Sequence, residues 1–252
     1  MGNEVLAVVT RTVNYRDNDR ILTLVTRTRG RVTATARACR KPQSKLMPCA
    51  QLFCYGEFEC YEQLGQLYIR SCDLHRNFYE LRLDPDALIA ASWACAVSEA
   101  FANPEEEYTK QFSLLLYTLQ ALCALQAEHK AVLAFFAVKQ LAFCGYQPQA
   151  DVCVDCGSTE QLTGYNAELG GVLCHKCAPI QPGTKRLSPM AVHMLANLPG
   201  VPSAAYHKIE KSLVPVAGEL LPVLARTIEQ FTDRKLPSLL FSTGFGRTDS
   251  RT

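Results

Sequence analysis

The first part of the chain alternates apolar and polar residues with the period of two that β-strands produce. Runs of this kind occupy residues 5–9, 21–26, 31–36, 52–60 and 66–71. Residues 27–30 separate two of these runs and end in a glycine, which suits a tight turn. Five short strands in about 75 residues favour a small closed barrel, of which an OB-like barrel is one form. We therefore expect residues 1–80 to form an OB-fold-like β-barrel.

From Asp84 onward the apolar positions recur with the period of an α-helix. Asp84 followed by Pro85 is typical of a helix start, with an acidic N-cap and proline at the first helical position. Helices are expected at residues 87–102, from 103 onward, and at 128–144, 188–197, 204–211 and 214–231. Pro215 and Pro222 leave the start of the last helix open. The pattern predicts a mainly α-helical domain over residues 81–252 and an α+β fold class for the whole chain.

Four cysteines interrupt the helical pattern as two close pairs. Cys153 and Cys156 form the first pair and Cys174 and Cys177 the second, in the pattern C-x₂-C-x₁₇-C-x₂-C. This spacing is typical of a zinc site with four thiolate ligands, in which one turn presents both sulfurs of a pair. Four protein ligands leave no open coordination position, so we expect one structural Zn²⁺ in a module inserted at residues 150–180.

Other interpretations of these cysteines are weaker. A dithiol redox pair would need only one of the two C-x₂-C motifs, and buried free cysteines would need no fixed spacing. His175 could replace Cys174 as a ligand, although the two cysteine pairs already complete a tetrahedron. The connection between the pairs, including residues 162–165, suits a small hairpin of the zinc-ribbon type.

Composition and charge place the chain among ordinary folded proteins, with one local exception. The chain of 252 residues is 48% hydrophobic and 20% charged, and its formal net charge is +2. Between Arg11 and Lys45, however, it carries ten basic residues against only Asp17 and Asp19. Arginine dominates this run, which suits binding of phosphate groups. The candidates for DNA phosphate contacts are Arg16, Arg20, Arg29, Arg31, Arg40, Lys41 and Lys45.

Aromatic residues follow the basic run and could add base stacking to phosphate binding. They are Phe53, Tyr55, Phe58, Tyr61 and Tyr68. Any of them that face outward could stack on bases, although we expect most to fill the barrel. Residues 40–45 suit a mobile basic loop on that barrel. The alternative is that the charges form only a solvated face.

Catalytic and targeting motifs are missing from the sequence. It contains no P-loop, G-x-G-x-x-G, G-x-S-x-G or H-E-x-x-H motif, so we expect a protein that is not an enzyme, with a metal-dependent nuclease as the weakest alternative. The N-terminus has an early acid and no cleavage site of the secretory type, and no apolar stretch reaches about 18 residues. Because nothing suggests secretion, the twelve cysteines indicate a reducing cytoplasm, where cysteines are mostly core residues or metal ligands. We therefore expect a cytoplasmic protein without a membrane partner. The C-terminal residues, with Gly244 and Gly246, are expected to fray.

Taken together, these segments resemble the RecO family of bacterial recombination and repair mediators. The resemblance begins at residues 15–24 (YRDNDRILTL), continues through 26–31 (TRTRGR) and 38–45 (ACRKPQSK), and resumes at 141–148 (LAFCGYQP), just before the cysteine pairs. It covers essentially the whole chain, and the order of the motifs is specific. The chain departs from the family near Ala38, where a glycine is usual, and at Gln43, where a lysine is usual; the C-terminal segment matches only loosely.

The resemblance implies an N-terminal OB-fold that binds nucleic acid, a helical C-terminal domain and an inserted zinc module. It also implies binding of single- and double-stranded DNA, annealing of complementary strands, and help in loading RecA onto gaps coated with single-strand-binding protein. The implied partners are RecR and the C-terminal tail of the single-strand-binding protein, and the implied location is the cytoplasm, at the nucleoid. The alternative function is a zinc-ribbon protein-interaction module without direct DNA activity.

Overall fold

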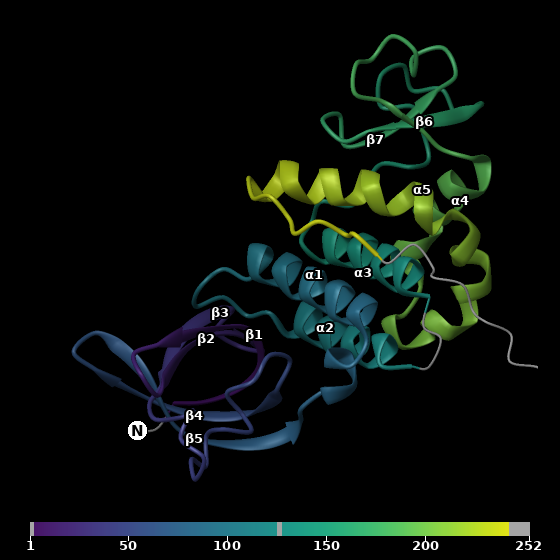
Figure 1. Cartoon of the computed structure of the whole chain (residues 1–252). Helices are drawn as coiled ribbons and strands as arrows, with labels where there is room; N and C mark the ends of the chain where they lie inside the picture. Colours follow the sequence, from purple (N-terminus) through teal and green to yellow (C-terminus); the bar gives the residue numbers. More distant parts are fainter. Residues whose placement is uncertain (1–2, 125–127, 242–252) are drawn as a thin grey trace, which may run out of the picture.

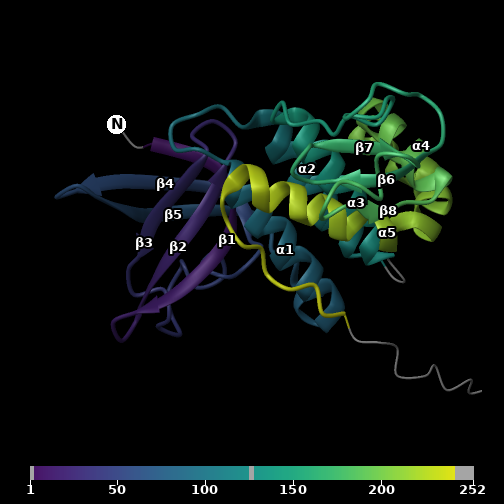
Figure 2. The same cartoon turned by 90° about the horizontal axis from the view of Figure 1, so that it is seen from above.

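The computed structural model describes residues 3–124 and 128–241 (Figure 1). A β-barrel lies at one end of a bundle of helices, and a small module that contains the four paired cysteines lies at the other end (Figures 1 and 2). The mixed α+β architecture predicted from the sequence is confirmed. The C-terminal glycines expected to fray, Gly244 and Gly246, lie outside the described residues.

The barrel closes through five strands in the order β1-β2-β3-β5-β4. The strands are β1 (Asn3–Tyr15), β2 (Asp19–Thr26), β3 (Arg31–Ala36), β4 (Tyr55–Gln63) and β5 (Gln66–Arg76). β3 pairs with β5 in parallel at Thr35 and Tyr68, and β1 closes the barrel by pairing with β4. A closed five-stranded barrel with this non-sequential order has the Greek-key character of an OB-fold, as the sequence predicts.

Residues that alternate along each strand fill the barrel. Ala7 and Val9 of β1, Leu22 and Leu24 of β2, and Phe58 of β4 are all fully buried. β1 is longer than the predicted residues 5–9 because it continues past an irregularity between Val9 and Arg11 as a ladder with β2. In that continuation the strand is held by backbone pairing, so apolar alternation alone does not reveal its length.

The helical domain is built around one helix that is buried over most of its length. Its first three helices are α1 (Pro85–Phe101), α2 (Thr109–Leu122) and α3 (His129–Phe143), and a short 3₁₀ helix, η1 (Tyr79–Arg82), links them to the barrel. All residues of α3 from 131 to 141 are buried, including Lys139, whose Nζ donates to the Pro199 carbonyl at 2.8 Å. Trp93 of α1 meets Phe136 of α3 edge to face, with ring centroids 6.3 Å apart. This contact joins the two helices in the core.

The C-terminal part of the domain consists of α4 (Pro189–Asn197), the 3₁₀ turns η2 (Leu198–Gly200) and η3 (Ser203–Ala205), and the long helix α5 (Tyr206–Thr232). The sequence predicts two helices, at 204–211 and 214–231, so this prediction is wrong: a single helix contains both Pro215 and Pro222. Both prolines are exposed, whereas the apolar face of α5 is buried against α3. Burial of that face offsets the backbone hydrogen bonds that the prolines remove.

α2 begins later than the sequence predicts because residues 103–107 contact the barrel. The Tyr108 amide donates to the Arg27 carbonyl at 3.0 Å, and Gly30 lies directly against Asn103. Gly30 has φ of +57°, and a Cβ added there would lie 1.7 Å from the Asn103 carbonyl oxygen. The turn between β2 and β3 therefore docks closely on the connection between α1 and α2. Within residues 3–124 and 128–241, no helix has both the length and the apolar character that a membrane span requires.

Candidate metal and nucleic-acid sites

The four paired cysteines converge in the module at the far end from the barrel. Their Sγ atoms all lie within 4.8 Å of one another. Two turns of the same form present them: the Gly157 amide donates to the Cys153 carbonyl at 2.9 Å, and the Ala178 amide donates to the Cys174 carbonyl at 2.9 Å. Gly157 has φ of +75°, a conformation that glycine adopts without strain. Each C-x₂-C motif therefore places both of its sulfurs on one side of a turn.

A small sheet supports these turns. β6 (Leu162–Asn166) and β7 (Gly171–Cys174) form the hairpin predicted between the cysteine pairs, and β8 (Lys185–Arg186) adds a third strand. Apart from the cysteines, Leu173 is the one fully buried side chain in the module's own apolar cluster. On its other side the small sheet packs into the main core through Tyr165 and Val172. The turns that carry the cysteines have little apolar burial of their own, as in structural zinc modules.

The sulfur positions and their surroundings fit a tetrahedral metal ion. The Sγ atoms of Cys156 and Cys174 are 3.7 Å apart, and a tetrahedron with Zn–S bonds of about 2.3 Å has edges of about 3.8 Å. Burial raises the pKa of the Cys153 thiol, but backbone amides that donate to its sulfur outweigh burial and lower that pKa to about 6. Amides of Cys177 and Lys176 likewise lower the pKa of Cys174.

The pKa of Cys177 is instead raised, chiefly by a hydrogen bond with Asp155. The Ser158 amide lowers the pKa of Cys156, but the neighbouring thiols of Cys153 and Cys174 outweigh this amide and raise that pKa. Cys153 and Cys174 therefore favour the thiolate, the form in which cysteine binds metals, whereas Cys156 and Cys177 would lose their protons to a bound metal.

The module is anchored to α5 by buried polar contacts. The Tyr165 hydroxyl of β6 and the Thr227 hydroxyl of α5 are 2.9 Å apart, and both residues are almost fully buried. Nearby, Glu219 of α5 accepts a hydrogen bond from the Ser188 amide at 2.7 Å. These contacts join the cysteine module to the same helix that packs on α3.

At the barrel, some of the predicted basic residues lie together. Arg16 occupies the turn between β1 and β2, with φ of +52°, and is exposed. Arg40 lies next to this turn, because its amide donates to the Asn18 carbonyl at 3.0 Å and its Nη1 donates to the Asp17 carbonyl at 3.1 Å. The Ala38 amide donates a hydrogen bond of 2.7 Å to the Asp19 carboxylate. The β1–β2 turn and the segment after β3 thus form one exposed surface.

The predicted loop at residues 40–45 is folded into successive turns. The Ser44 amide donates to the Lys41 carbonyl at 2.9 Å, and the Met47 amide donates to the Ser44 carbonyl at 3.1 Å. Lys41 and Lys45 are both exposed on this segment. We call Arg16, Arg40, Lys41 and Lys45 the basic cluster.

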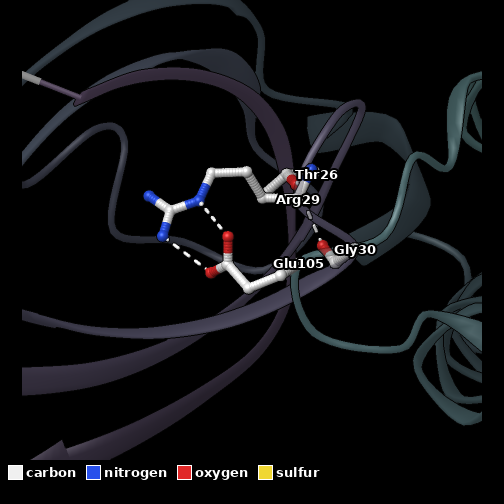
Figure 3. A network of polar contacts seen from close by, with 4 residues as sticks. All are labelled: Thr26, Arg29, Gly30 and Glu105. Atoms are coloured by element: carbon white, nitrogen blue, oxygen red, sulfur yellow. Dashed lines mark hydrogen bonds and ion pairs between the residues drawn. The ribbon is translucent and has the colours of Figure 1, made fainter.

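The other three predicted contacts, Arg20, Arg29 and Arg31, have partners within the protein. Arg20 Nη1 donates to the Ala50 carbonyl at 2.6 Å, and Arg31 Nη1 donates to the Glu99 carbonyl at 3.1 Å. Arg29 forms a two-point pair with Glu105, with distances of 2.7 and 3.2 Å (Figure 3). Glu105 and Glu99 belong to the helical domain, so Arg29 and Arg31 lie at its boundary with the barrel. Sequence spacing alone does not distinguish these arginines from the exposed ones.

The five aromatics of the predicted barrel also differ in position. Phe53 and Phe58 are fully buried, and Tyr55 packs against Phe112 of α2, with ring centroids 6.1 Å apart. Tyr61 and Tyr68 are instead partly exposed on the outer face of β4 and β5. Two residues that the sequence interpretation did not select, Arg37 and Arg70, lie over the rings of Tyr68 and Tyr61 respectively.

Both the barrel and the helical domain match known protein families. The family described as Recombination protein O N terminal matches residues 1–78, and the family described as Recombination protein O C terminal matches residues 82–240. A DNA repair protein RecO of Anaeromyxobacter sp. strain K is 31% identical, with 94% of each chain covered. The protein of the same name from Symbiobacterium thermophilum is 28% identical, with 93% of this chain and 94% of the relative covered. The protein of that name from Desulforamulus reducens is 29% identical, with 93% of this chain and 91% of the relative covered.

Proposed function

The chain belongs to the RecO family of DNA repair proteins, and we propose that it is a mediator of DNA repair and recombination that performs no catalytic chemistry. It binds single- and double-stranded DNA through the barrel, anneals complementary strands, and helps to load RecA onto gaps coated with single-strand-binding protein. The observation that carries this proposal is the basic cluster on one surface of an OB-like barrel. In OB-folds, a strand face and the loops around it are the usual binding surface for oligonucleotides.

Phosphate binding by the basic cluster requires exposed cations without strong partners. Lys41 and Lys45 meet this requirement best, since both are exposed. Arg16 and Arg40 lie beside them, and their guanidinium groups suit bidentate contacts with phosphate oxygens. Arg20, Arg29 and Arg31 also belong to the proposed contact set, but we expect each to contribute less to phosphate binding, because each is partly buried and donates to an acceptor within the protein. Arg40 also donates to a carbonyl, that of Asp17, but its side chain is exposed.

The experiment that tests DNA binding is a salt titration of affinity for a single-stranded oligonucleotide. Each neutralised phosphate contributes about 0.7 to the slope of log affinity against log salt on single strands. Lys41→Gln combined with Lys45→Gln should therefore make the slope shallower by about 1.4, and it should weaken binding with little dependence on sequence.

A matched control is available on the helical domain. Lys208 and Lys211 are also exposed lysines, but they lie on α5. Lys208→Gln with Lys211→Gln removes the same charge and should leave the slope unchanged. Equal slopes for the wild-type protein and the Lys41/Lys45 variant would show that these lysines do not contact DNA phosphates.

Annealing follows from binding without any bond-breaking step. Two complementary strands repel each other through their phosphates, and a basic surface screens that repulsion. Contacts that are weak and independent of sequence allow the strands to shift until they are in register. The proposed activity therefore needs only the charge and shape of the barrel surface, and it needs no ATP.

We further propose that RecR and the C-terminal tail of the single-strand-binding protein are partners and that the protein works in the cytoplasm, at the nucleoid. The support is family membership together with apolar surface on the helical domain. A groove of about 360 Å³ between β5 and α2 is lined by Phe78, Leu116 and Tyr117, and half of Tyr117 is exposed. Such a groove suits a short peptide with apolar anchors. A pull-down from cell extract, with and without nuclease, separates direct partners from proteins bridged by DNA.

We also propose that the metal at the four cysteines is a single Zn²⁺ with a structural role. The complete set of four thiolates leaves no position for a substrate, and thiolates select zinc over Mg²⁺ or Ca²⁺. In the alternative function, this module would be a zinc ribbon that binds another protein, and the basic charge of the barrel would be incidental. Salt-dependent binding to bare single strands favours the DNA mediator, and its absence favours the interaction module.

A further inference from the structure

Two tyrosines and two arginines contact one another in pairs on the outer face of the barrel, where Arg70 also forms an ion pair of 2.8 Å with Glu59. Tyr61 of β4 and Tyr68 of β5 are directly opposite each other in the ladder, with ring centroids 5.5 Å apart and ring planes 25° apart. The guanidinium of Arg37 lies 3.9 Å from the centroid of the Tyr68 ring. The guanidinium of Arg70 lies 5.3 Å from the centroid of the Tyr61 ring. We call these four residues the aromatic stack.

The aromatic stack is accessible and adjoins the basic cluster. Arg37 and Arg70 are exposed, and both tyrosine rings are partly exposed. Arg37 comes directly after β3 and directly before Ala38, whose amide is bonded to Asp19 beside the β1–β2 turn. Arg37, which lies over the Tyr68 ring, is therefore three positions from Arg40 on the same segment, so the aromatic stack and the basic cluster are linked through this segment.

We propose that the aromatic stack is a binding site for unpaired nucleobases and that it makes the barrel prefer single strands to duplexes. This inference rests on the proposed DNA binding. A base stacks on the Tyr68 ring in place of the Arg37 guanidinium, and Arg37 then turns to a phosphate of the same strand. Stacking on an aromatic ring is tolerant of sequence because every base has a π-face. In a duplex the neighbouring base pairs cover those faces, so only the phosphate contacts remain available.

The experiment compares two single-stranded oligonucleotides with the same number of phosphates, one of thymidines and one of abasic sites. The wild-type protein should bind the thymidine strand more tightly. Tyr68→Ala should lower affinity for the thymidine strand by about fivefold or more, the effect of losing one base–aromatic stack. Affinity for the abasic strand should not change, because the phosphate contacts remain. Tyr68→Phe keeps the ring and should bind both strands as the wild-type protein does.

A matched control distinguishes base stacking from a general effect of removing a surface tyrosine. Tyr79 is also exposed and also has an arginine, Arg82, 5.2 Å from its ring centroid, but it lies in η1. Tyr79→Ala should leave the ratio of the two affinities unchanged. If Tyr68 served only to stabilise the β4–β5 hairpin, Tyr68→Ala would lower the melting temperature and leave that ratio intact, which would overturn the inference.

A spectroscopic readout reports stacking directly and does not need a destabilising variant. The chain has one tryptophan, Trp93, and it is buried in the helical core at 1% exposure. The indole introduced by Tyr68→Trp should be quenched by the thymidine strand and unaffected by the abasic strand. Equal affinities of the wild-type protein for the two strands, with salt dependence intact, would reject the aromatic stack and leave phosphate binding standing. Binding to neither strand would reject both the stack and the proposed function.

Discussion

Cys174→Ser is expected to release the metal and to unfold the cysteine module, while the barrel and the remaining helices stay folded. The module's own apolar cluster contains one fully buried side chain besides the cysteines, Leu173, while Tyr165 and Val172 pack into the main core. We therefore expect metal binding at the four cysteines to supply much of the folding free energy of the turns that carry them. For zinc-finger peptides the corresponding apparent free energy is about 10–16 kcal/mol. Cys174 ends β7 and is 2% exposed, so its loss removes both a ligand and a buried contact.

Two measurements check this prediction. Elemental analysis should find one zinc per chain in the wild-type protein and none in the variant, and limited proteolysis should cut the variant within residues 150–180. Cys123→Ser is the control, because Cys123 is the C-cap of α2 and lies outside the cluster of paired cysteines. Wild-type protein without any bound metal would contradict the account, as would a variant that keeps its zinc and its resistance to protease.

Gly30→Ala is expected to lower the free energy of unfolding by several kcal/mol. Two effects add at this position. A residue with a Cβ is strained at φ of +57°, at a cost of about 1–2 kcal/mol. The new Cβ would also lie 1.7 Å from the Asn103 carbonyl oxygen, so the contact between the barrel and the helical domain must open. Overpacking of this kind costs about 1–3 kcal/mol or more.

Gly65→Ala separates the two effects. Gly65 also has a positive φ, of +72°, but a Cβ there would meet no atom within 4 Å. Gly65→Ala should therefore lower the free energy of unfolding by the backbone strain alone, about 1–2 kcal/mol. Chemical denaturation of both variants measures the difference. Equal losses of stability for Gly30→Ala and Gly65→Ala would mean that the close docking of the β2–β3 turn contributes nothing.

Local patterns in the sequence predict much of this fold for clear physical reasons. Alternation identifies the barrel strands because each has one face inside the barrel, and the spacing of the cysteines predicts their convergence because a C-x₂-C turn presents both sulfurs to one point. Long-range packing is harder to predict. Pro215 and Pro222 indicate a break that burial of the apolar face of α5 prevents. The real length of β1 depends on its pairing with β2 and β4.

The candidate DNA surface is only partly visible in the sequence. A run of basic residues indicates the region, but it cannot reveal that Arg29 pairs with Glu105, which is 76 positions away in the chain. Likewise, the sequence does not show that Tyr61 and Tyr68 face outward together. That fact depends on the register of β4 and β5, and one residue of slip would turn either ring into the barrel.

We propose that the basic barrel brings complementary DNA strands together, and the decisive experiment is an annealing assay without ATP. Fluorescence quenching follows the pairing of two labelled complementary oligonucleotides as it occurs. We expect the protein to speed pairing, rising salt to weaken this effect, and Lys41→Gln with Lys45→Gln to reduce it. With strands coated by the single-strand-binding protein, the effect should persist and should disappear when the C-terminal tail of that protein is deleted. A rate equal to that of the protein-free control at every salt concentration would contradict the account and favour a protein-interaction module.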